Sequence, residues 1–135
     1  MNSPILSKTA NASAIWVAKS DTGGLWKYSI GDERWSSNYS GTSDYPSDYP
    51  RSVTGSEDGT IIYSAGGDFI GTGNYSIWKS TSSSGASFSS LDGTKKWLGI
   101  KSSGDGTKLI GWTISNDVWI SENSGATWYL ANTGA

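Results

Sequence analysis

The chain has 135 residues, enough for one domain, with 16% charged residues and a formal net charge of −2. It contains neither Cys nor His, which excludes disulfides, thiolate nucleophiles, Ser-His-Asp catalysis and the usual transition-metal sites. Because its only two arginines are Arg34 and Arg51, duplex nucleic acid is not an expected partner.

The predicted elements are short strands separated by turn residues, and they fall into three successive sets of four. The first set covers residues 5–8, 14–18, 25–29 and 34–37. The second covers 51–56, 60–65, 75–80 and 87–91, and the third covers 97–103, 108–113, 118–121 and 127–131. Asp-Gly pairs predict hairpin turns between the first two strands of the later sets. No segment has a useful 3.6-residue apolar period, so the chain is predicted to be all-β.

Aromatic side chains supply the predicted core. The chain has 8 Trp, 7 Tyr and 2 Phe, and large rings can build a core from short strands. No apolar stretch approaches the ~18 residues of a membrane-spanning helix, so no membrane insertion is expected. The start, Met1 to Leu6, has neither a basic nor an extended apolar region, so no signal peptide is expected there. We expect an extracellular, cell-surface or virion location.

The three sets repeat one another. Asp58-Gly59-Thr60 and Asp105-Gly106-Thr107 lie 47 residues apart, and Val53 then falls on Ile100. Two aromatic positions recur in all three sets: Trp26, Trp78 and Trp119 occupy one, and Trp35, Phe88 and Trp128 occupy the other. Four antiparallel strands in about 45 residues, repeated in tandem, are typical of β-propeller blades, whereas a sandwich is not expected to repeat in register. We predict one propeller domain over 1–135, with blade-like repeats at about 1–48, 49–95 and 96–135.

The segment Ser121-Glu122-Asn123-Ser124-Gly125-Ala126-Thr127-Trp128 resembles the Asp-box, Ser/Thr-x-Asp-x-Gly-x-Thr-Trp/Phe, of sialidase-type (BNR-repeat) propellers. Asn123 stands where the family usually has Asp, and residues 81–88 form a weaker copy with Ser83 at that position. The motif predicts a turn between the third and fourth strands, in which a short polar side chain binds backbone amides. Gly125 is expected at positive φ, and Trp128 is expected to fold inward between neighbouring sheets.

Catalysis is not expected. Sialidases that resemble this fold hold the substrate carboxylate with three arginines, and this chain has two. A glycosidase with two catalytic carboxylates is the remaining enzymatic alternative. The three glutamates, Glu33, Glu57 and Glu122, fall in predicted turns, where a carboxylate is usually solvated. We therefore predict no catalytic residue, no metal and no cofactor.

Aromatic residues that do not repeat between the sets are the candidates for ligand binding. Trp112 aligns with Ala18 and Ala65, so blade geometry does not require a ring there. The candidates for a carbohydrate site are Trp97, Trp112, Tyr45, Tyr49 and Asp48. Sugar C–H faces stack on exposed rings while the hydroxyls take polar partners. The alternative for Trp97 and Trp112 is that they fill space between blades.

These residues predict a non-catalytic, lectin-like propeller module that binds carbohydrate. The alternative is a structural or interaction component of a virion or cell-surface assembly. Three blades form only an open arc, because propellers close with about 4–8 blades. Such an arc exposes apolar flanks, which we expect to include Trp26 and Trp119, and such flanks favour association. We expect a homodimer to close a six-bladed ring, unless the chain belongs to a longer propeller or to an assembly with other proteins.

Overall fold

The computed structural model describes residues 5–7, 14–18, 24–37, 50–67, 75–81 and 87–131, with only the backbone described for 5–7 and 37. Within these ranges the chain forms twelve strands and no helix. The strands are β1 (Ile5–Ser7), β2 (Ala14–Ala18), β3 (Leu25–Ser29), β4 (Arg34–Ser37), β5 (Pro50–Gly55), β6 (Ile62–Gly66), β7 (Ser76–Ser80), β8 (Ser89–Asp92), β9 (Trp97–Ser102), β10 (Leu109–Thr113), β11 (Val118–Ser121) and β12 (Tyr129–Leu130). The prediction of an all-β chain with three sets of four strands is confirmed.

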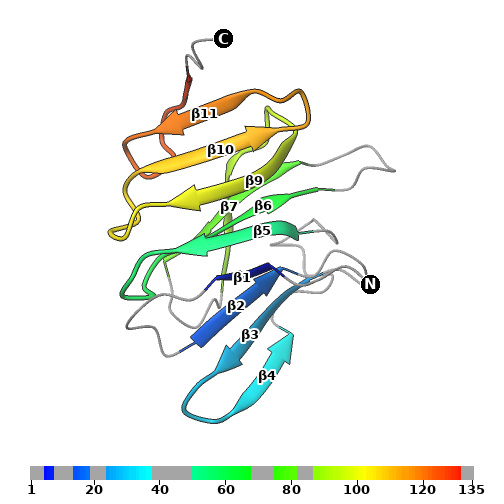
Figure 1. Cartoon of the computed structure of the whole chain (residues 1–135), viewed down its shortest axis with the longest axis vertical. Coiled ribbons are helices and arrows are strands. Elements are labelled where there is room, and N and C mark those ends of the chain that lie inside the picture. The colour runs from blue at the N-terminus through cyan, green and yellow to red at the C-terminus, as the bar shows by residue number, and fades with distance from the viewer. Residues whose placement is uncertain are drawn as a thin grey trace.

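Each set of four strands forms one antiparallel sheet with its strands in chain order (Figure 1). We call β1–β4 sheet 1, β5–β8 sheet 2 and β9–β12 sheet 3. All strand bounds agree with the predicted ones within two residues. The last strand is shorter than predicted because the preceding turn holds Thr127 and Trp128. Thr127 N donates to Asn123 Oδ1 (2.9 Å), and Trp128 Nε1 donates to the Gly125 carbonyl (3.2 Å).

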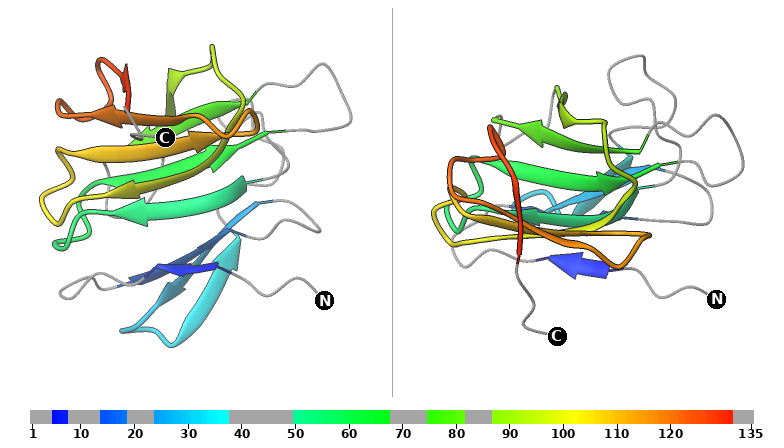
Figure 2. Two further views of the ribbon diagram at one scale, coloured as in Figure 1. Left: turned by 45° about the horizontal axis from the view of Figure 1, so that its top comes forward. Right: turned by 90° about the horizontal axis from the view of Figure 1, so that it is seen from above.

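The three sheets lie side by side in chain order, with sheet 2 in the middle (Figures 1 and 2). Strand β5 contacts β1 and β2 on one side and β9 on the other. One face of sheet 2 therefore packs on sheet 1 and the opposite face packs on sheet 3. Within the described part of the chain, sheets 1 and 3 each keep one face that no other sheet covers. We call these two surfaces the outer faces of sheets 1 and 3.

The core consists of two apolar clusters, one at each junction between sheets. The cluster between sheets 1 and 2 contains Trp16, Ala18, Leu25, Val53, Ile62, Trp78 and Phe88. The cluster between sheets 2 and 3 contains Tyr63, Ala65, Ile77, Trp97, Ile100 and Leu109, with Ile61, Leu91, Trp119 and Trp128 packed against it. In sheets 2 and 3 the recurring aromatic positions are thus core positions that face the preceding sheet, whereas in sheet 1 Trp26 is half-buried and Trp35 is exposed.

The two Asp-Gly-Thr hairpins, 56–60 and 103–107, have the same internal hydrogen bonds. Asp105 Oδ1 accepts from Ser103 Oγ (2.6 Å), Thr107 N (3.0 Å) and Thr107 Oγ1 (2.8 Å). The first hairpin has the same three bonds at the same distances. The glycines of the two hairpins have φ of 72° and 74°, which a residue with a side chain rarely adopts. The bonds from Ser103 and Thr107 lower the pKa of Asp105 to about 2, and the pKa of the first hairpin's aspartate is also lowered.

The turn between β11 and β12 has the conformation that its sequence predicts. Ser121 Oγ accepts a hydrogen bond from Gly125 N (2.9 Å). Asn123 binds Thr127 twice, since its Oδ1 accepts from the backbone N (2.9 Å) and its Nδ2 donates to Oγ1 (2.8 Å). Gly125 has a φ of 88°, and the Trp128 ring packs against the cluster between sheets 2 and 3. Polar side chains therefore hold this turn, and its tryptophan packs at the junction.

Candidate functional site

The outer face of sheet 3 is the candidate functional site. Along β10, Leu109, Gly111 and Thr113 are buried. The alternating residues, Ile110 and Trp112, are 43% and 41% exposed. The cross-strand register adds residues from the neighbouring strands to this face: Gly99 and Lys101 on β9, Val118 and Ile120 on β11, and Tyr129 on β12. The result is an apolar sheet face with one lysine, Lys101, on its first strand.

Trp112 packs against the backbone of this face. Its ring lies over Gly99, the residue opposite it on β9, and a Cβ at Gly99 would overlap the ring. The reverse arrangement occurs on the buried face, where a Cβ at Gly111 would lie 2.6 Å from Cζ3 of Trp97. Each glycine thus makes room for a large ring on its own side of the sheet. Trp112 keeps part of its ring surface open to solvent.

Trp112 also lines a cavity of about 370 Å³ near the first strands of sheets 2 and 3. The other lining residues are Arg51, Ser52, Val53, Leu98, Ile100 and Lys101. The cavity therefore combines one partly exposed ring with two cationic side chains and a hydroxyl. An aromatic surface beside hydrogen-bond donors is suited to a ligand that has both an apolar face and polar groups.

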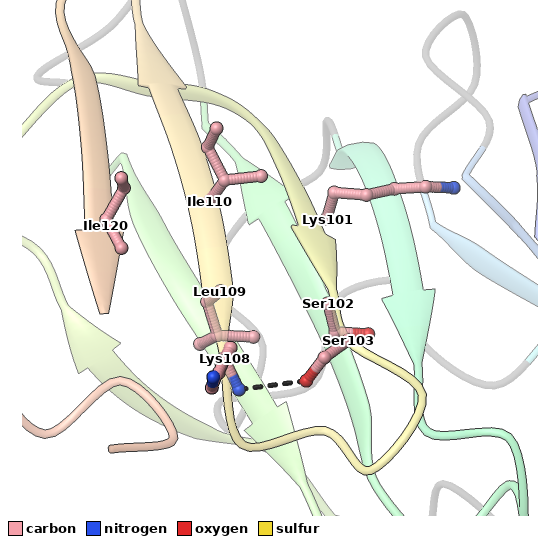
Figure 3. Close-up of a pocket in the computed structure, with 7 residues that line it drawn as sticks. All are labelled: Lys101, Ser102, Ser103, Lys108, Leu109, Ile110 and Ile120. Carbon is pink, nitrogen blue, oxygen red and sulfur yellow. Dashed lines mark hydrogen bonds between the residues drawn. The ribbon is translucent and has the colours of Figure 1, made fainter. Parts of the chain in front are cut away.

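A second cavity, of about 270 Å³, lies on the same sheet beside the β9–β10 hairpin (Figure 3). Figure 3 shows Ile110 and Ile120, which are cross-strand partners on β10 and β11. Lys101 and Lys108 also line the cavity, and Lys108 N donates to Ser103 Oγ (3.0 Å) to close the hairpin. A cavity lined by two isoleucine side chains as well as two lysines suits an apolar side chain of a partner rather than a fully polar ligand.

The structure corrects one predicted site residue and leaves three outside its description. Trp97 is 0% exposed, and its ring centroid lies 4.8 Å from that of Trp128. The expectation of an exposed Trp97 ring is therefore wrong. The pairing of β9 with β10 shifts register near Trp97, and this shift directs the ring toward sheet 2. Tyr45, Tyr49 and Asp48 lie outside the described residues, so Trp112 is the one predicted aromatic that is both described and exposed.

Trp119 is a second correction, because it does not lie on an exposed flank. It packs against the cluster between sheets 2 and 3, with Lys95 Nζ 4.7 Å from its ring centroid. The exposed flank carries Ile110 and Trp112 instead, and Ile110 is not among the predicted site residues. The 47-residue repeat contains the signal, since Ile110 falls on Tyr63, which is buried under sheet 3.

Acidic side chains in the described ranges lie in turns or in local ion pairs. Glu33, Glu57 and Glu122 are exposed in turns, as predicted. Burial by itself would raise the pKa of Asp92, but hydrogen bonds from Lys95 (2.7 Å) and Thr94 hold it below its ordinary value. No three His, Cys, Asp or Glu residues in these ranges group as metal ligands. The same ranges contain no helix that is long and apolar enough to span a membrane.

No family model and no curated protein matches the chain. Solved structures do match its fold. A chain of the nidogen/laminin complex matches with a TM-score of 0.71 at 12% identity, over 93% of this chain and 46% of that chain. The GH74 xyloglucanase from Xanthomonas campestris matches with 0.71 at 18% identity, over 92% and 20%. YCF48 from Cyanidioschyzon merolae matches with 0.65 at 15% identity, over 94% and 39%.

These structural neighbours are β-propeller proteins, and identities below 20% mean that the likeness shows the fold alone. The chain spans less than half the length of each of these neighbours. Because propellers serve both enzymes and interaction proteins, the fold does not assign a function. The three sheets are four-stranded β-propeller blades, as the repeat predicts.

Proposed function

We propose that this chain is a non-catalytic binding module built from propeller blades, and that it binds a partner through the outer face of sheet 3. One observation carries the proposal. The face of sheet 2 that sheet 3 covers and the outer face of sheet 3 are formed by equivalent positions of two successive repeats. The second surface remains apolar although no described sheet covers it.

The repeat assigns the equivalent positions residue by residue. The matching hairpins place Ile110 at the position of Tyr63 and Trp112 at the position of Ala65. Both sheet 2 residues are 0% exposed beneath sheet 3. Their counterparts in sheet 3 are more than 40% exposed. An apolar sheet face of this kind is normally packed, and an uncovered one marks an interaction surface.

The acidic residues support a non-catalytic reading. A general acid or base works best with a pKa near the working pH. The pKa of Asp105 is lowered to about 2 by its hydrogen bonds to Ser103 and Thr107, which suits a turn rather than proton transfer. The xyloglucanase is a glycoside hydrolase by name, but at 18% identity the similarity supports a shared fold and not a shared activity.

A second candidate function is lectin-like carbohydrate binding, favoured by the cavity beside Trp112. The partly exposed ring could stack on a sugar while Lys101 and Arg51 supply donors. The resemblance of residues 121–128 to the Asp-box, a motif of sialidase-type propellers, is compatible with this candidate and does not separate it from the first. Both candidates use Trp112, so one pair of variants tests both.

The experiment compares the wild-type chain with Trp112→Asp and with Leu130→Asp as the matched control. Leu130 is 55% exposed but lies on β12 opposite Trp119, away from the outer face. Binding to a glycan array and self-association by light scattering are measured for all three proteins. We expect any binding detected to be lost in Trp112→Asp and kept in Leu130→Asp. Binding that survives in Trp112→Asp, or hydrolysis of a panel of chromogenic glycosides by pure protein, would overturn the proposal.

A further inference from the structure

Building on the proposed function, we infer that the partner of the outer face of sheet 3 is a second copy of this chain. In that assembly the outer face of sheet 1 of the second copy docks where a fourth blade would stand. The inference rests on the outer faces of sheets 1 and 3. These two faces are equivalent to the two surfaces that pack together where one blade contacts the next inside the chain.

The outer face of sheet 1 carries three rings, of which Trp35 is exposed and the other two are half-buried. Trp16 and Leu25 belong to the cluster that faces sheet 2, so the alternating residues Trp26 and Tyr28 on β3 lie on the opposite face. Trp35 pairs with Tyr28 across the strands, and their ring centroids are 5.0 Å apart. Trp35 is 54% exposed. This face therefore presents an aromatic group that no described sheet covers.

In the other two sheets, the residue equivalent to Trp35 fills the junction with the preceding sheet. Phe88 is 5% exposed and lies edge-on to Trp16 of sheet 1, with ring centroids 6.4 Å apart. Trp128 packs against the cluster that contains Tyr63 of sheet 2. Sheet 1 has the same ring in Trp35, and no described sheet packs on that side.

The two outer faces are therefore equivalent to the two surfaces that pack together at each junction inside the chain. Ile110 of sheet 3 is the repeat equivalent of Trp16, and Trp35 is the repeat equivalent of Phe88. The pair Trp16–Phe88 inside the chain becomes the pair Ile110–Trp35 between two copies. In the first pair the tryptophan belongs to the earlier blade, and in the second pair it belongs to the later blade. The summed side-chain volume at the contact therefore stays similar.

Ring closure fixes the number of copies. Each junction joins two different surfaces, so repeated docking gives either a closed ring or an open filament. Propellers close with about 4–8 blades, and two copies supply six while three copies supply nine. Two copies related by a twofold axis along the propeller axis thus close the ring with both outer faces covered.

The test measures the mass of the full 135-residue chain by light scattering over a range of concentrations. We expect a mass twice that of the 14.3 kDa chain. Trp112→Asp removes one half of the junction and Trp35→Asp removes the other. Each is expected to weaken self-association by about 30-fold or more, the effect of losing a hot-spot residue. Leu130→Asp is expected to remain dimeric.

A mixture of the two variants tests whether the junction joins different surfaces. Trp112→Asp keeps an intact sheet 1 face, and Trp35→Asp keeps an intact sheet 3 face. The mixture should form a heterodimer through one intact junction at concentrations where each variant alone is monomeric. Near-UV circular dichroism of each variant verifies folding. If Trp112→Asp does not fold, Trp35→Asp still decides, because Trp35 is an exposed side chain.

A monomeric wild-type chain, a trimer, or a dimer that survives both variants overturns the inference. A monomer that binds a glycan through Trp112 would overturn the second copy as partner while leaving the proposed function in place. Binding that does not depend on Trp112 would overturn both.

Discussion

Among the side chains that the structure describes, the two junctions between the sheets are built differently. The junction between sheets 1 and 2 is a cluster of rings and aliphatic side chains, with Trp16 edge-on to Phe88. The junction between sheets 2 and 3 adds hydroxyl groups to its apolar cluster. Ser52 Oγ donates to the Ile100 carbonyl (3.1 Å) and accepts from Ile100 N (3.2 Å). Thr54 Oγ1 accepts from Ser102 N (3.2 Å).

We call these hydrogen bonds of Ser52 and Thr54 the hydroxyl ladder. Two further hydrogen bonds link sheets 2 and 3 near the hairpins that follow β5 and β9. Tyr63 Oη donates to the Gly106 carbonyl (2.8 Å), and Glu57 N donates to the Gly104 carbonyl (2.6 Å). The first strand of each blade is a sheet edge, whose backbone groups need partners when buried. Hydroxyls from β5 supply those partners to β9. A chain rich in Ser and Thr can therefore use these residues at the junctions between its blades.

The largest expected effect is the loss of Trp97 from the second junction. Trp97→Ala should lower the free energy of unfolding by about 3–5 kcal/mol, because it empties a fully buried ring site. Trp112→Ala is the matched change on the outer face and should cost about 1 kcal/mol or less in the monomer. Urea unfolding at one low protein concentration measures both. Equal losses would mean that Trp112 belongs to the core.

The hydroxyl ladder gives the next effect. Ser52→Ala or Thr54→Ala should each cost about 1–3 kcal/mol, because a buried backbone N–H on β9 loses its acceptor. The control is Ser89→Ala, whose exposed hydroxyl makes only a 3.5 Å contact and should change stability by less than about 0.5 kcal/mol. Hydrogen exchange at Ile100 and Ser102 should speed up in the two junction variants. Unchanged exchange would mean that rings alone hold this junction.

A smaller effect is expected from a substitution that makes the outer face of sheet 3 more like the covered face of sheet 2. Lys101 stands at the position of Thr54, the residue that bonds to the next blade. Lys101→Thr gives the outer face the missing hydroxyl and should tighten self-association by about 2- to 10-fold, the effect of one hydrogen bond. Sedimentation equilibrium measures the change. Lys108→Thr is the control, and an equal gain there would point to charge rather than to the hydroxyl.

The smallest effect is the pH response of the hairpin at 103–107. The pKa of Asp105 falls from 3.8 to about 2 in the folded chain. A lowered pKa stabilises the fold when the carboxylate is charged, so the contribution is complete above about pH 5 and is lost as the pH falls toward 2. Carboxyl-carbon NMR titration should give the low value directly, and Asp105→Asn should flatten the acid limb of the stability curve. A titration near 3.8 would contradict the hydrogen-bond geometry.

The strands, the turns and the repeat can be predicted from the amino-acid sequence alone. These features are local, since Asp-Gly pairs select a hairpin turn and Gly125 meets the need for a positive φ. Recurring rings at Trp78 and Trp119 identified core positions for the same reason, because equivalent blades need equivalent packing. The three sheets therefore follow from residues that are close in sequence.

The side of the sheet that each non-repeating ring occupies depends on the tertiary fold and could not be predicted. Trp97 and Trp112 look alike in sequence, but Trp97 packs over Gly111 under sheet 2 and Trp112 packs over Gly99 on the outer face. The face depends on a register shift in β9–β10 and on the presence of a neighbouring sheet. The hydroxyl ladder from Ser52 and Thr54 was also invisible in sequence, because its partners lie about 48 residues away and are backbone groups. Burial and cross-sheet bonding depend on the placement of whole sheets, which no local pattern encodes.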